Sequence, residues 1–131
     1  MRIYLSFVAA LALGTTPVLA QSDLGDEAWV AYEISNLRLA GSIRPTIVFP
    51  EPGRVSVFSG CNRYMGPVVV EGTKLAFPPT LAGTLMACPP EQERLQKQVL
   101  NVLPMVRSYL LRDGILSLLN DKGVAVMRLS Q

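Results

Sequence analysis

The chain contains two cysteines, Cys61 and Cys88, which are 27 positions apart and are its most reactive side chains. A cysteine can serve as a nucleophile, as a metal ligand or as one half of a disulfide. The sequence has no histidine, so neither a Cys–His pair nor a Ser-His-Asp triad can be built. Two thiols without imidazole also make a poor zinc site. We therefore expect no metal and no cofactor.

The other polar residues offer no catalytic set either. Glu91 and Glu93 are the closest acidic pair, but side chains two positions apart on a helix diverge and cannot share an acid–base reaction. Asn62 is interpreted as a turn residue, because asparagine tolerates left-handed backbone geometry; contact with a ligand is the alternative. Arg63 is interpreted as a surface or ion-paired residue, with binding of an anion as the alternative. The sequence thus predicts a protein that is not an enzyme.

Residues 1–20 have the features of a cleavable secretory signal peptide. Arg2 supplies a positive charge, residues 3–13 form an apolar run, and Val18 and Ala20 occupy the small-residue positions before the cleavage site. The apolar run is shorter than the ~20 residues of a membrane-spanning helix, although an uncleaved anchor is the alternative. No cysteine lies near residue 21, which excludes lipoprotein processing. We expect a soluble periplasmic protein.

The remaining chain is predicted to form a short N-terminal segment (21–28) and one domain (29–131), a typical domain size. Loss of Arg2 with the leader leaves eleven basic and ten acidic residues. This balance, with the basic residues spread singly, gives no reason to propose nucleic-acid binding. No second apolar run is long enough to span a membrane. We expect a monomer without an integral membrane segment.

Most of this domain has the pattern of short strands bounded by turn residues. The predicted strands cover residues 29–34, 45–49, 54–59, 64–70, 74–77, 106–111, 115–119 and 124–129. One helix is predicted to begin at Pro90 and to end before Pro104, which lacks the N–H that a helix needs. Asp113-Gly114 predicts a tight hairpin turn.

These elements predict an α+β fold, in which one main helix packs on an antiparallel meander that is strongly curved or partly closed. Residues 68–70 and 110–111 are apolar on both strand faces, so the sheet should be covered, closed or curved around a cavity. The candidate lining of such an apolar cavity is Val57, Phe77, Leu95 and Val99. Met65, Met86 and Met105 are expected to fill the core, and Trp29 and Tyr64 to anchor it.

The segments around the two cysteines also carry a family resemblance. Their motifs are Gly60-Cys61-Asn62-Arg63-Tyr64-x-Gly66 and Thr84-x-Met86-Ala87-Cys88. With Trp29, Leu75-x-Phe77, the helix and the closing meander, the chain resembles the META/HslJ family from about residue 29 to residue 129. It departs from the common pattern at Pro67 and in the Phe77-Pro78-Pro79 segment.

This resemblance implies a compact α+β domain of the bacterial envelope. Members are linked to heat-shock or antibiotic-stress phenotypes and have no established catalytic activity, and their fold is similar to that of a lipid-binding type III secretion pilotin. The motif residues are therefore interpreted as architecture. In an oxidising compartment, the two motif cysteines are expected to form a Cys61–Cys88 disulfide; two buried reduced cysteines are the alternative.

Two functions follow from these expectations. The favoured one is a non-catalytic exported envelope protein that supports stress or antibiotic tolerance through protein or surface interactions. The alternative is a periplasmic carrier or sensor of a small apolar, lipid-like ligand held between sheet and helix. The partner would accordingly be an unidentified envelope protein or an apolar small molecule.

Overall fold

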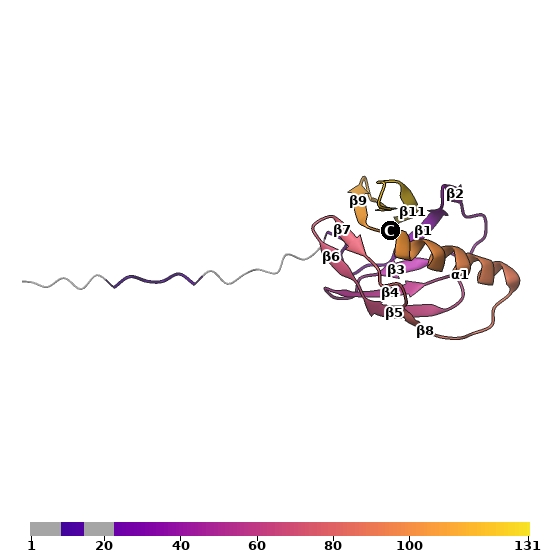
Figure 1. Cartoon of the computed structure of the whole chain (residues 1–131), viewed down its shortest axis with the longest axis horizontal. Helices are drawn as coiled ribbons and strands as arrows, with labels where there is room; N and C mark the ends of the chain where they lie inside the picture. Colours follow the sequence, from indigo (N-terminus) through magenta and orange to yellow (C-terminus); the bar gives the residue numbers. More distant parts are fainter. Residues whose placement is uncertain (1–8, 15–22) are drawn as a thin grey trace, which may run out of the picture.

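The computed structural model of the chain describes residues 9–14 and 23–131 (Figure 1). The predicted cleavage site and most of the predicted signal peptide lie outside the described residues, so both stay predictions. Residues 9–14 form neither helix nor strand. No helix within the described residues is long and apolar enough to cross a membrane.

The described part of the domain contains eleven strands, one α-helix and a short 3-10 helix. The strands are β1 (Trp29–Ile34), β2 (Leu37–Arg38), β3 (Thr46–Val48), β4 (Arg54–Phe58), β5 (Arg63–Pro67), β6 (Val69–Glu71), β7 (Lys74–Ala76), β8 (Ala82–Gly83), β9 (Ser108–Arg112), β10 (Ile115–Leu119) and β11 (Ala125–Ser130). The helix α1 spans Pro90–Val102, and the 3-10 helix η1 follows it at Leu103–Met105.

The strands form one antiparallel sheet in the order β6-β7-β9-β10-β11-β1-β3-β4-β5-β8, and β2 pairs with the end of β1. The sheet curls strongly into a half-barrel, and α1 packs on it. In Figure 1 the helix crosses the middle of the domain, with β9 and β11 on one side of it and β3, β4 and β5 on the other. The predicted α+β class and the strongly curved antiparallel sheet are confirmed.

Local sequence signals determine both ends of α1. Pro90 occupies the first turn, where its missing N–H has no helical partner to lose, and two glutamates, Glu91 and Glu93, lie at the positive end of the helix dipole. Pro104 ends the regular helix, and the chain tightens into η1. The helix turns Val99 and Val102 into the core, as an amphipathic cover for one sheet face should.

The C-terminal meander is the part of the fold that the sequence predicts best. Strands β9, β10 and β11 pair in chain order, with Leu116 opposite both Leu111 and Leu129. Asp113 and Gly114 connect β9 to β10 with φ angles of 53° and 75°. Two successive left-handed residues make the tight hairpin turn whose twist matches that of the flanking strands.

The core confirms Trp29 as an anchor, but the expectation for three methionines is wrong. The Trp29 side chain is buried, and its Nε1 donates a hydrogen bond to the carbonyl of Leu24 at 2.9 Å. Met65, Met86 and Met105 are 57%, 60% and 47% exposed. Met65 faces outward because it alternates with Tyr64, which packs against the core. Methionine content therefore does not identify the core of this domain.

The two segments that are apolar on both strand faces, residues 68–70 and 110–111, are not covered on both faces. Val68 is buried, whereas Val69 and Leu110 are exposed, so the outer face of the sheet is uncovered at these points. The predicted strand 64–70 is also interrupted. Between β5 and β6 the Val68 N–H turns to the carbonyl of Gly53 at 2.9 Å, which separates the two strands.

Candidate functional site

The two cysteine motifs meet at one end of strand β4 and are joined covalently. Cys61 and Cys88 form a disulfide with a Cα–Cα distance of 5.9 Å. The bond ties the turn between β4 and β5 to the segment that leads into α1. The expected cross-link is therefore present, and the described cysteines are not the reduced pair that was the alternative.

Asn62 joins the same two segments by hydrogen bonds. Its side chain is buried, and its amide pairs with the backbone of Met86: the Met86 N–H donates to Oδ1 at 2.7 Å, and Nδ2 donates to the Met86 carbonyl at 3.2 Å. The Thr84 hydroxyl also donates to Oδ1, at 2.9 Å. The Asn62 amide thus makes with the Met86 backbone the two hydrogen bonds that a neighbouring strand would otherwise make. The left-handed turn residue of this motif is Gly60, with φ 101°, and not Asn62.

Two polar residues that the sequence did not single out connect the motif to the helix. The Ser59 hydroxyl lies 2.7 Å from Gln96 Oε1, which also accepts a hydrogen bond from the Asn62 N–H at 3.0 Å. The helix approaches so closely here that a Cβ at Gly60 would lie 2.7 Å from Leu95 Cδ2. In the sequence, the role of Ser59 is indicated only by its position directly before the Gly-Cys-Asn motif.

The other motif residues either pack against neighbouring side chains or lie at the surface. Gly66 lies against Leu81, and a Cβ on Gly83 would overlap the ring of Tyr64. Arg63 is exposed, with its guanidinium 5.1 Å from the ring centroid of Phe58. Ala87 is exposed in the segment held by the disulfide.

A groove between the N-terminal half of α1 and the loop after β2 is a hollow of the described surface that could hold a ligand. Its volume is about 600 Å³, within the range of ligand sites. The lining residues are Ile34, Leu37, Arg38, Leu39, Ala40, Gly41, Ser42, Ile43, Pro89, Glu91, Gln92, Arg94, Leu95 and Gln98. Ile34 belongs to the core and Leu95 packs against it, so the groove reaches the edge of the hydrophobic interior.

Leu95 is the one residue of the four predicted cavity residues that borders this groove. Val57, Phe77 and Val99 are buried in the hydrophobic core. The groove therefore lies beside the region where a cavity was predicted, and an internal cavity lined by all four residues stays a prediction.

Comparison with known proteins agrees with the motif geometry. The family model described as "META domain" matches residues 22–131. The chain belongs to the META domain family. An NMR structure of a protein from Burkholderia xenovorans superposes with a TM-score of 0.62 at 24% identity, covering 89% of this chain and 95% of that one. A second NMR structure gives a TM-score of 0.62 at 23% identity, covering 82% and 90%. At these identities the likeness shows the fold alone. No match was found among curated proteins.

The described residues contain no cluster of three or more His, Cys, Asp or Glu side chains that could hold a metal ion. Burial raises the pKa of the Tyr109 phenol above its ordinary value, and the Asp23 carboxylate adds to the increase. Tyr109 is buried on β9 and does not border the groove. The groove accordingly offers apolar contact and a charged rim.

Proposed function

We propose that this META domain is a non-catalytic, exported envelope protein that supports stress or antibiotic tolerance through interactions with a protein or a surface. The observation that carries the proposal is a rigid, exposed apolar segment next to the disulfide. Leu85 is 98% exposed, yet Thr84 and Met86 on either side of it are fixed by Asn62. Met86, next to it, is 60% exposed, and contiguous exposed apolar side chains on a fixed loop mark interaction sites.

The disulfide supports the proposed location. Such bonds persist in oxidising compartments, which include the bacterial periplasm, and are rare in the reducing cytosol. Here the bond ties the exposed segment to the turn between β4 and β5, in addition to the hydrogen bonds of Asn62 that fix the residues beside Leu85. Export and interaction are thus linked in one structural feature.

Complementation of a strain that lacks the gene would test this proposal. We expect the wild-type chain to restore survival after heat or antibiotic challenge, and Leu85→Asn to fail although it melts like the wild type, because the variant removes only exposed apolar surface. Leu110→Asn is the matched control. Leu110 is also exposed, but it lies on β9, which is distant in the sheet order from β8, the strand that precedes Leu85. A chain without residues 2–20 should fail as well.

Fractionation and mass measurement belong to the same experiment. The protein recovered from the periplasm should begin at Gln21 or within a residue or two of it. An intact Met1 on the envelope protein, or full rescue by the Leu85→Asn variant, would contradict the proposal.

A second candidate function, carriage or sensing of a small apolar ligand, is favoured by the groove beside α1. The groove brings Ile34 and Leu95 of the hydrophobic interior to its floor and has Arg38 and Arg94 on its rim. An apolar body with a polar end would match this arrangement.

Titration with a fatty acid tests the second candidate. We expect saturable binding and a raised melting temperature, because a ligand at about 100 times its Kd adds about 2.7 kcal/mol to the free energy of unfolding. Ala40→Trp should fill the groove and abolish the effect, whereas Val124→Trp, at an exposed position elsewhere, should not. Equal binding by both variants would exclude the groove as the site.

A further inference from the structure

The outer face of the sheet gathers arginines that are scattered in the sequence. Along β1, β3 and β4 the side chains alternate between a buried inner set and a more exposed outer set. Across this outer face, Val30 of β1, Thr46 of β3, Phe58 of β4 and Arg63 of β5 follow one another in register.

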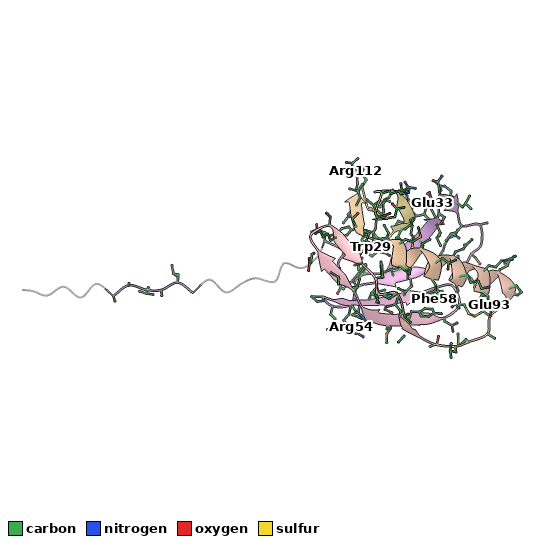
Figure 2. The ribbon with its side chains drawn as sticks, viewed as in Figure 1. Trp29, Glu33, Arg54, Phe58, Glu93 and Arg112 are labelled. Carbon is green, nitrogen blue, oxygen red and sulfur yellow. A yellow bond between two sulfur atoms is a disulfide. The ribbon has the colours of Figure 1, made fainter. Side chains whose placement is uncertain are left out.

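Four arginines belong to this part of the surface, which we call the arginine face: Arg38, Arg44, Arg54 and Arg63. Because β11 occupies the other edge of β1, β2 lies on the same edge as β3 and is two strand spacings, about 10 Å across the sheet, from β5. Figure 2 shows Arg54 and Phe58 towards opposite ends of β4.

Aromatic rings hold two of these guanidiniums in place. Arg63 lies 5.1 Å from the ring centroid of Phe58, and Arg38 lies 5.8 Å from that of Tyr32. A stacked guanidinium keeps its N–H groups free for an oxygen acceptor while its orientation is fixed. Both rings are half-buried, so the arginines are anchored to the body of the sheet.

Arg44 has an uncompensated charge. It precedes β3, on the same side of the chain as Thr46, because the intervening Pro45 is buried. The Ala31 N–H bonds to the Pro45 carbonyl at 2.9 Å, which continues the β1–β3 pairing and places Arg44 next to Tyr32. Its Nη1 atom is buried without a hydrogen-bond partner. An unpaired buried donor of a charged group is unfavourable, and an anion nearby would relieve the cost.

Carboxylates on the same strands do not neutralise the arginine face. Glu33 is held by Arg128, whose Nη1 donates to Glu33 Oε1 at 2.7 Å, and that is the ion pair found among the described residues. Glu33 also lies opposite Arg38 in the pairing of β1 and β2, but its ion pair is with Arg128. The face therefore has an excess of positive charge.

An exposed apolar side chain lies beside the arginines at the β5 edge of the face. Met65, two residues after Arg63 on the same side of β5, is 57% exposed. Leu37 pairs with the buried Ile34 and lies on the opposite face, where it borders the groove beside α1. Cations that meet headgroup phosphates, flanked by apolar side chains that enter the acyl region, are typical of peripheral membrane binding. A dissolved polyanion would use the arginines alone and leave Met65 in water.

We infer that the arginine face docks on the surface of a phospholipid bilayer that contains anionic lipids. The inference rests on the proposed function, in that it names the surface that an envelope protein of this type contacts. Arg38, Arg44 and Arg63 bind the phosphates, and Met65 inserts between the lipid chains.

Co-sedimentation with vesicles tests this inference. We expect binding to phosphatidylethanolamine vesicles that contain about one-quarter phosphatidylglycerol, no binding to pure phosphatidylcholine, and a steep loss of binding as salt is raised. The triple variant Arg38→Gln/Arg44→Gln/Arg63→Gln should weaken binding roughly 100-fold, since each arginine at such a surface contributes about five-fold. Met65→Gln should weaken binding while leaving the salt dependence unchanged.

The matched control removes the same charge from exposed positions elsewhere on the surface: Lys74→Gln/Lys97→Gln/Lys122→Gln. All proteins are compared in the same processed form, with masses measured, because a leader would itself bind bilayers. Circular dichroism melting shows whether the triple variant folds. If it does not, vesicle binding is compared between the single variants Arg63→Gln and Lys97→Gln.

Equal losses of binding in the two triple variants would overturn the inference. So would binding to dissolved polyphosphate without binding to vesicles, or no binding to the anionic vesicles. The assay uses purified protein, so a failure of export in cells is read separately.

Discussion

Removing the Cys61–Cys88 disulfide should lower the melting temperature by roughly 10–15 °C. The bond closes a loop with a sequence separation of 27, and in the chain-entropy model a loop of this length destabilises the unfolded state by about 3.6 kcal/mol. That is a large share of the ~5–15 kcal/mol that stabilises a typical domain. The change is made as Cys61→Ser/Cys88→Ser and followed by thermal unfolding.

Reductant provides the control for this result. It should lower the melting temperature of the wild type by a similar amount and leave that of the double variant unchanged. The disulfide is reduced while the protein is unfolded, and the melting temperature is then measured on the refolded protein. An unchanged melting temperature would show that the cross-link does not stabilise the fold.

Replacing Asn62 by alanine should lower the free energy of unfolding by about 2–4 kcal/mol, because a buried side chain loses several hydrogen bonds at once. The Met86 N–H and the Thr84 hydroxyl both lose their acceptor, and the Met86 carbonyl loses its donor. The disulfide still tethers the segment at Cys88, so the loss reports on the amide alone. Urea unfolding measures the change.

Asn120 is a matched control for Asn62. Its Oδ1 also accepts two backbone hydrogen bonds, from the N–H groups of Lys122 and Val124, but these bonds are exposed to solvent. Asn120→Ala should therefore cost no more than about 1 kcal/mol. Faster hydrogen exchange at the Met86 amide in Asn62→Ala, and not in Asn120→Ala, would locate the effect. Equal costs for the two variants would contradict the role assigned to Asn62.

The sequence predicts those parts of the fold that short-range physics determines. Pro90 and Pro104 set the ends of α1 because a missing N–H acts within one turn of helix. Asp113-Gly114 sets a hairpin because two left-handed residues are required there. For strand β1, the predicted and observed bounds agree at Trp29–Ile34.

The features that the sequence does not reveal depend on segments distant in the chain. Strands β2 and β8 have two residues each and exist only through their pairing with β1 and β5. The role of Asn62 depends on the position of Met86, which a disulfide and a second segment establish. The arginine face depends on strand register, so the apparent even spread of charge along the chain conceals it. The groove beside α1 likewise results from the path of the loop after β2.

The central position of β1 has a consequence for the way the chain comes to fold. β1 is the first strand, yet besides the short β2 its partners are β3 and the last strand, β11, with Val30 opposite Ser130. A ribosome-bound fragment that lacks the final residues cannot complete the sheet, because the β11 side of β1 stays open. Pairing over such a separation is also slow. A polypeptide that must thread through a translocase before it folds gains from this delay, since synthesis ends before a stable structure can block the passage. The C-terminal residues thus decide when the chain can fold.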